Sequence, residues 1–224
     1  FPTRRSSDLN AARMNRSCDR MCIPPIDEAM QLKAIESLVD IERAWLPHGQ
    51  GTSLYIRPVI IGIGSELGVV KAAPRYIYFI LCSPSGAYYP RGIEPIRIRL
   101  EEKYVRAVKG GTGAAKTGGN YAGSLKATRA AIEDGFDQVL WLDGRERKYV
   151  EEVGAMNMFF VLDGVLSTPR LGDTVLAGNT RDSILRLARD KGMAVKERDI
   201  AADELVTAFE AGRLSESFGC GTAA

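Results

Sequence analysis

A glycine-rich stretch around one lysine constrains this chain more than any other part of its sequence. Residues 109–121 read K-G-G-T-G-A-A-K-T-G-G-N-Y, with five glycines distributed on the two sides of Lys116. Glycine lets the backbone adopt positive φ angles and approach a bound group closely. The stretch therefore predicts a loop that surrounds a ligand and carries a lysine at its centre.

Three interpretations of this stretch stay open on the residues alone. A surface loop with a solvated lysine has the same composition. The segment from Gly110 to Thr117 approaches the phosphate-binding motif G-x-x-x-x-G-K-[ST], but Ala115 stands where that motif has its second glycine, and a side chain there crowds a phosphate. The third interpretation is a lysine that forms a Schiff base with a carbonyl cofactor.

Composition narrows the function classes. The chain has 224 residues, 45% hydrophobic and 26% charged, which is typical of soluble globular proteins with one large or two small domains. Its 30 basic and 28 acidic residues give a net charge of +2 without a long basic run, so no nucleic-acid partner is predicted. No apolar run reaches the roughly 18 residues of a membrane-spanning helix, so no membrane partner is predicted either.

Cysteine and histidine usage points to a cytoplasmic protein without a metal site. The four cysteines and the single His48 form neither a C-x-x-C pair nor an H-E-x-x-H motif. Reduced thiols in the cytoplasm are the simplest explanation of the cysteines. His48, between Pro47 and Gly49, has the neighbours of a surface turn and is not expected to act in a catalytic pair.

Two motifs together identify a family. The stretch around Lys116 and the downstream segment V-E-E-V-G-A-M-N-M-F-F, residues 150–160, resemble the branched-chain amino acid aminotransferases of the fold-type IV pyridoxal phosphate enzymes. The resemblance runs from about Leu9 to Ala224. It implies a mixed α/β, two-domain architecture whose C-terminal domain is incomplete, because family members continue beyond Ala224.

The resemblance and the turn residues divide the chain into segments. Residues 1–8 lack an apolar signal region, do not match the family, and are expected to be a foreign or misread beginning. A small α/β domain is predicted over 9–90, an interdomain connector over 91–102, and a truncated cofactor-binding large domain over 103–224.

Local signals predict several elements within the last segment. Residues 120–134 fit a helix that is closed by Gly135. Residues 138–143, Q-V-L-W-L-D, are a strand by their content. Asp163-Gly164 predicts a tight hairpin turn.

The cofactor that the resemblance implies is pyridoxal 5'-phosphate. Lys116 would carry it as a Schiff base and shuttle the proton, and Tyr121 would bind its phenolic oxygen. Two adjacent carboxylates usually form a solvated turn, but the match to E-V-G-x-M-N selects Glu152 as the partner of the pyridine nitrogen. The phosphate would be held by Arg13, by the amides of Asn179 and Thr180 at a predicted helix start, and by Thr222.

The resemblance also implies a substrate pocket. Tyr55 and Arg57 project from one face of a predicted strand, where the family places its substrate pocket and the carboxylate end of the substrate. Further pocket residues would be Val69 in a loop that reaches the neighbouring subunit, Tyr88, and the amide of Ala223. The implied partners are therefore a second subunit in a homodimer, leucine, isoleucine or valine, and 2-oxo acids, with 2-oxoglutarate as amino acceptor.

Alternative functions stay open. D-amino acid aminotransferase and aminodeoxychorismate lyase share the lysine–glutamate arrangement, although S-L-Y-I-R-P and G-G-N-Y favour the branched-chain group. A nucleotide-binding protein that uses Gly110 to Thr117, or an inactive fragment, are the others. The sequence departs from the family at Asn179, where an apolar residue is usual, and at Ala155, which replaces a frequent threonine.

Overall fold

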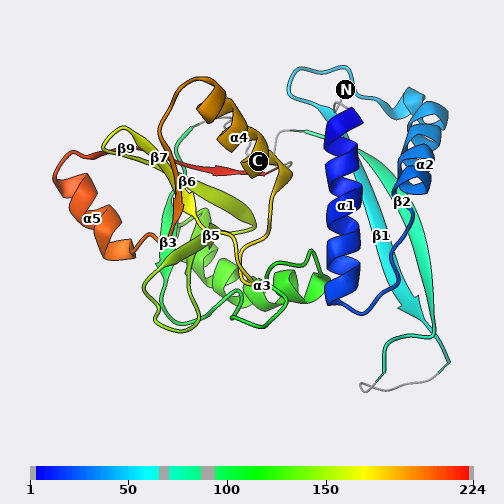
Figure 1. Ribbon diagram of the computed structural model, residues 1–224, viewed down its shortest axis with the longest axis horizontal. Helices are drawn as coiled ribbons and strands as arrows, with labels where there is room; N and C mark the ends of the chain where they lie inside the picture. Colours follow the sequence, from blue (N-terminus) through cyan, green and yellow to red (C-terminus); the bar gives the residue numbers. More distant parts are fainter. Residues whose placement is uncertain (1–3, 66–70, 87–93, 222–224) are drawn as a thin grey trace. The chain divides into compact units, whose positions relative to one another are not determined.

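The computed structural model describes residues 4–65, 71–86 and 94–221. The chain separates into two compact units, residues 1–92 and 93–224, and each is described by itself (Figure 1). Within the described ranges, no helix is both long and apolar enough to cross a membrane.

The first unit consists of helices and a long hairpin. Its elements are α1 (Arg4–Arg20), α2 (Glu28–Ile41), the short 3₁₀ helix η1 (Arg43–Trp45), β1 (Ser53–Ile63) and β2 (Arg75–Ser85). The two strands pair antiparallel over their whole length. Helix α2 packs on both α1 and β2, and it begins where the Asp27 carboxylate accepts a 2.7 Å hydrogen bond from Met30 N.

Helix α1 extends into the first eight residues. It begins at Arg4, so it includes residues 4–8 of the segment that we expected to be a foreign or misread beginning. An arginine- and serine-containing segment carries no strong helix signal by itself, and the helix nevertheless continues through it. The predicted domain and connector boundaries themselves stay a prediction.

The second unit is built on a seven-stranded mixed sheet. Its strands are β3 (Ile98–Glu101), β4 (Gln138–Leu142), β5 (Val150–Val153), β6 (Met156–Leu162), β7 (Val165–Pro169), β8 (Val195–Arg198) and β9 (Leu214–Cys220). The order is β3-β4-β5-β6-β7-β8, and β9 also pairs with β6. The β3–β4 and β7–β8 pairs are parallel and the others are antiparallel.

Three helices complete this unit: α3 (Gly118–Glu133), α4 (Asn179–Asp190) and α5 (Ala202–Glu210). Helix α3 lies in the connection between the parallel strands β3 and β4, and α4 lies in the connection between β7 and β8 (Figure 1). The predicted hairpin at Asp163-Gly164 is confirmed, because both residues have positive φ angles, 50° and 75°, between β6 and β7.

Among the described residues, two apolar clusters lie in the core of the second unit. One joins α3 to β4 through Ala127, Ala131, Val139 and Trp141. The other joins α4 to the sheet through Phe159, Leu166, Leu185, Ala188 and Cys220. Strand β5 has all four of its residues buried. Adjacent side chains of a strand point to opposite faces, so both faces of β5 are covered.

Candidate active site

Glu152 lies at the centre of the candidate site. It belongs to β5 and is only 2% exposed. Its Oε1 accepts hydrogen bonds from Leu176 N at 2.8 Å and from Asn157 Nδ2 at 3.2 Å, and Asn157 is its direct partner on β6. Its Oε2 lies 3.1 Å from Arg106 Nε in a buried ion pair. The carboxyl group is therefore held from both sides.

The surroundings of Glu152 set its proton affinity. Burial raises the pKa of Glu152 to about 7, and the charge of Glu151 adds to this effect. Arg106, the Leu176 amide and Lys116 act in the opposite direction. A carboxyl group with a pKa near neutrality is typical of functional sites, because burial and specific charges must be combined to produce it.

Glu151 and Glu152 are both buried, which the sequence alone did not indicate. Burial also raises the pKa of Glu151, and its Oε2 has no hydrogen-bond partner among the described residues. The charge of Arg106 favours the ionised form of both carboxyl groups. The acidic pair is therefore a buried feature around one guanidinium and not a solvated turn.

Arg106 connects Glu152 to the glycine-rich loop. Its Nη2 donates to the carbonyl oxygens of Thr174 and Gly113, the latter at 3.3 Å. Its Nε makes no hydrogen bond within the described part of the chain, although the Glu152 carboxylate lies beside it. No quoted motif contains Arg106, and sequence reasoning missed it.

The loop before Lys116 is fixed by a buried asparagine. Asn120 accepts a 2.7 Å hydrogen bond from Thr112 Oγ1, and its Nδ2 donates at 2.8 Å to Thr112 O and to Ala115 O. Gly113 packs so tightly that an added Cβ would lie 2.5 Å from Ala107 Cβ and 2.7 Å from Thr174 O. These contacts give the stretch a defined shape.

Lys116 emerges from this loop beside Tyr121. Its Nζ lies 5.8 Å from the centroid of the Tyr121 ring, which is in the first turns of α3. The charge of Lys116 is close enough to Glu152 to lower the pKa of that carboxyl group. The second unit therefore brings Lys116, Tyr121 and Glu152 into one neighbourhood.

The start of α4 adjoins the same neighbourhood. Asn157 Nδ2 also donates to Leu176 O at 2.9 Å. The first helical hydrogen bond of α4 runs from Asp182 N to Gly178 O at 3.1 Å, so the amides of Asn179 and Thr180 have no carbonyl partner in the helix. The buried Nδ2 of Asn179 also lacks a partner among the described residues. Such a helix start can bind an anion.

The remaining predicted residues lie elsewhere in the chain. Arg13, Tyr55 and Arg57 belong to the first unit. There Arg13 Nη2 donates to Asn10 Oδ1 at 2.6 Å, and the Arg57 guanidinium lies 5.0 Å from the centroid of the Tyr55 ring. Four predicted residues lie outside the described ranges: Val69, Tyr88, Thr222 and Ala223.

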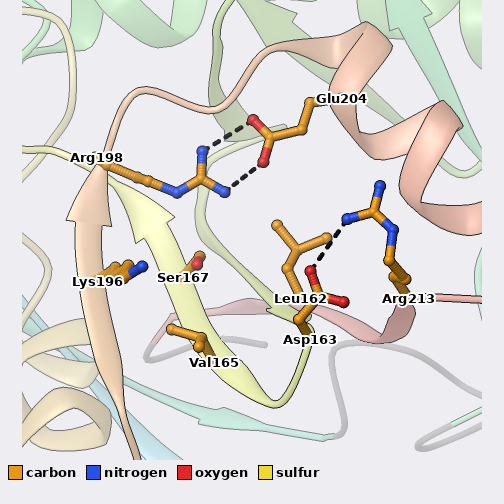
Figure 2. A pocket seen from close by; sticks show the side chains of 8 residues that line it. All are labelled: Leu162, Asp163, Val165, Ser167, Lys196, Arg198, Glu204 and Arg213. Carbon is orange, nitrogen blue, oxygen red and sulfur yellow. Dashed lines mark hydrogen bonds and ion pairs between the residues drawn. The ribbon is translucent and has the colours of Figure 1, made fainter.

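A separate pocket on the second unit contains none of the predicted site residues. Eight residues line it: Leu162, Asp163, Val165, Ser167, Lys196, Arg198, Glu204 and Arg213. Figure 2 shows that its two carboxylates are each paired with an arginine, Glu204 with Arg198 and Asp163 with Arg213. This pocket lacks a buried carboxyl group of raised pKa beside the glycine-rich lysine loop. We therefore place the candidate site at Glu152.

Comparisons with known proteins agree with the fold and with the motifs. The model of the amino-transferase class IV family matches residues 4–223. The chain is 53% identical over 217 residues to branched-chain-amino-acid aminotransferase 2 of Bacillus subtilis (strain 168), covering 97% of this chain and 60% of that protein. It is 47% identical over 223 residues to the branched-chain-amino-acid aminotransferase of Mycobacterium tuberculosis, with the same two shares. The chain thus spans about 60% of the length of these curated relatives.

Solved structures of the same kind match nearly the whole chain. The branched-chain aminotransferase of Thermoproteus uzoniensis with norvaline gives a TM-score of 0.80 at 28% identity, covering 97% of this chain and 68% of that one. The T.th. branched-chain amino acid aminotransferase with pyridoxamine 5'-phosphate gives 0.80 at 29% identity and the same coverage. The resemblance and the mixed α/β fold-type IV architecture expected from the sequence are confirmed. This chain belongs to the amino-transferase class IV family.

Proposed function

We propose that the protein containing this chain transfers the amino group of branched-chain L-amino acids to 2-oxoglutarate, with pyridoxal 5'-phosphate as cofactor. The observation that carries the proposal is the ion pair between Arg106 and Glu152, because Arg106 also binds the loop that presents Lys116. The backbone of the loop that carries the Lys116 amine is thereby tied to the buried carboxyl group. The names of the similar proteins support the branched-chain substrate class.

The residues of the second unit fit this cofactor. A phosphorylated pyridine aldehyde needs an amine for its carbonyl carbon, a carboxyl group for its ring nitrogen and donors for its phosphate. Lys116 and Glu152 offer the first two, and Tyr121 would bind the phenolic oxygen. The unpartnered Nδ2 of Asn179 and the helix amides of Asn179 and Thr180 offer donors within the described part of the chain. Arg13 and Thr222 would complete the phosphate site.

When bound, pyridoxal phosphate supplies a ring that accepts the electrons of the bond broken at the substrate Cα. The Lys116 amine would take the proton from the substrate Cα and deliver it to the C4′ carbon of the cofactor. Because Asn120 fixes the backbone before Lys116, little conformational freedom has to be lost at that step. Glu152 in its charged form would hold a proton on the ring nitrogen, and Arg106 favours that charged form by lowering the pKa of Glu152.

The substrate side of the site is proposed from the first unit. Tyr55 and Arg57 are alternate residues of β1 and so share a face of the hairpin. The tyrosine would border the apolar side-chain pocket, and the arginine would organise the carboxylate end. Val69 of a second subunit, Tyr88 and the Ala223 amide would contribute as well, so a homodimer is the proposed working form. The proposed location, the cytoplasm, rests on the cysteine usage.

The test combines trapping with two substrates. Pyridoxal phosphate is added to the wild-type chain and to the Lys116→Ala and Lys109→Ala variants. The Schiff base is then reduced with borohydride, and the labelled peptide is mapped. Lys109 and Lys116 are both exposed lysines of the same loop, so Lys109→Ala is the matched control. We expect the label at Lys116, lost only in Lys116→Ala. Label at other lysines alone would reject the assignment. In the longer protein, turnover of D-alanine without turnover of L-leucine would replace the substrate class with that of a D-amino acid aminotransferase.

A further inference from the structure

Asn157 lies between Glu152 and the start of α4, the two parts of the candidate site that would hold the ring nitrogen and the phosphate. It is 6% exposed, and its backbone is paired on both sides, with Glu152 of β5 and with Cys220 of β9. Because the backbone is held on both sides, the Cα atom from which this side chain projects is fixed. Its amide can therefore act as a rigid spacer.

Both donors of the Asn157 amide are used. One N–H points to Glu152 Oε1 at 3.2 Å and the other to Leu176 O at 2.9 Å. Leu176 N in turn donates to the same Glu152 oxygen at 2.8 Å. The three residues form a closed ring of hydrogen bonds, in which the amide nitrogen must face the two acceptors.

The oxygen of the same amide faces the start of α4. A Cβ added to Gly178 would lie 2.1 Å from Asn157 Oδ1, so the backbone at Gly178 approaches the amide as closely as glycine permits. Gly178 is the residue immediately before α4. Asn157 therefore holds Glu152 with its nitrogen while its oxygen lies against the start of the helix.

We propose that Asn157 is a positioning residue that sets the spacing between Glu152 and the start of α4, so that one phosphorylated pyridine meets both at once. This inference rests on the proposed function, in which Glu152 binds the ring nitrogen and the α4 amides bind the phosphate. Asn157 itself touches neither end of the ligand. Its contribution is to join two weak binding events into one strong event, as a rigid linker does.

The first experiment compares whole and partial ligands. Dissociation constants of pyridoxal 5'-phosphate, pyridoxal and inorganic phosphate are measured for the wild-type chain and for Asn157→Ala. Loss of two hydrogen bonds that fix the spacing should weaken pyridoxal phosphate binding about tenfold or more. Pyridoxal and phosphate, which each need only one end, should change by no more than about threefold.

A second variant changes the contact between Asn157 and Gly178 at the glycine. Gly178→Ala keeps Asn157 but forces its amide and the helix start apart. We expect the same pattern of weakened whole ligand and little-changed partial ligands. Gly123→Ala, on an open surface of α3, is the matched control and should change none of the three constants.

Hydrogen exchange tests the spacer without any ligand. In the cofactor-free chain, the amides of Leu176 and Asp182, which donate to Glu152 Oε1 and to Gly178 O, should exchange faster in Asn157→Ala than in the wild type. Asn120→Ala removes a similarly buried side-chain amide, the one by which α3 holds the Lys116 loop, and should leave these amides unchanged.

The outcomes separate the two proposals. A wild-type chain that binds no pyridoxal phosphate overturns the proposed function, while the exchange measurement still decides whether Asn157 holds the start of α4. Unchanged exchange at the Leu176 and Asp182 amides overturns the inference. So does an unchanged affinity for pyridoxal phosphate in Asn157→Ala, or an equal loss of affinity for all three ligands, which is the mark of a merely structural role.

Discussion

Asn120 donates a 2.8 Å hydrogen bond to the carbonyl oxygen of Ala115, the residue immediately before Lys116. Helix α3, which begins just after the lysine, thus holds the loop that precedes it. A flexible lysine loop would need to be ordered at each catalytic step, and this contact removes most of that requirement. Glycine also allows close packing in this loop, as Gly113 shows against Ala107 and Thr174.

Gly113→Ala should destabilise the second unit by about 1–3 kcal/mol. The new methyl group would lie at 2.7 Å or less from the Ala107 side chain and the Thr174 backbone, and backbone atoms cannot move aside cheaply. Urea unfolding followed by fluorescence measures the effect. Gly123→Ala, within α3 and with open space around it, should instead stabilise by about 0.5–1 kcal/mol. Equal stabilities of the two variants would contradict the packing argument.

The stability of the second unit should depend on pH through Glu152. Its pKa in the folded chain is about 7, against 4.5 for the ordinary group, so the folded state binds this proton more tightly than the unfolded state. The contribution is complete below pH 4.5 and is lost as the pH rises through 7, by an amount on the order of 3 kcal/mol. The raised pKa of Glu151 adds a loss in the same direction.

Glu152→Gln should flatten this pH dependence. The free energy of unfolding is measured from about pH 4.5 to 8 through the fluorescence of the buried Trp141, in a Trp45→Phe background. Carboxyl groups with lowered pKa values act mainly below this window; they are Glu101, Asp143, Glu197 and Glu204. An identical slope in the variant and the parent would refute the assignment to Glu152.

Arg106→Met should raise the pKa of Glu152 further, because the largest charge that favours the carboxylate is removed. The acid limb of the pH–rate profile of the longer protein should then move to higher pH. The chain should also lose about 3 kcal/mol of stability, as expected when one partner of a buried ion pair is deleted. Arg129→Met, which removes the arginine of an exposed pair with Glu133, is the control and should shift neither quantity.

The cysteines should differ in reactivity with a thiol reagent at about pH 8. Burial raises the pKa of the Cys220 thiol to about 11 and also raises that of Cys18, so few thiolates form there. Cys22 is exposed and should be modified first, as peptide mapping after brief alkylation can establish. Rapid labelling of Cys220 in the folded chain would mean that the β6–β9 pair opens readily.

Loss of the Arg13 guanidinium tests the proposed phosphate contact of the first unit. Arg13→Met should weaken pyridoxal phosphate binding more than pyridoxal binding, because only the phosphate can form the paired contact with a guanidinium. Arg20→Met, at the end of the same helix, provides the comparison. An equal loss for both ligands would mean that Arg13 supports the helix and not the phosphate.

The sequence predicted the elements of the second unit well where local chemistry decides them. The strand expected from Gln138 and the hairpin at Asp163-Gly164 are present, because β-branched, aromatic and other apolar residues and residues that tolerate positive φ act locally. The helix expected from Asn120 begins two residues earlier, at Gly118. Helix starts without a side-chain cap carry a weak signal, and Thr117 makes no such hydrogen bond.

The site was predictable only in part. Lys116 is marked by its glycines, but resemblance was needed to choose Glu152 over Glu151, because both are buried and alternate across one strand. Arg106 and Asn157 act through partners that are distant in sequence or that depend on the sheet register. No local pattern encodes such pairings. The roles assigned to these residues in binding stay predictions.

Strand β6 shares hydrogen bonds with β5, β7 and β9. During synthesis its pairing with β9 is incomplete until Cys220, the partner of Asn157, has left the ribosome. The strand that pairs with Asn157 on the side away from Glu152 is thus the last of the seven strands of this sheet to be made. The apolar run Met158, Phe159 and Phe160 lacks its β9 partner during that interval, which leaves it open to aggregation.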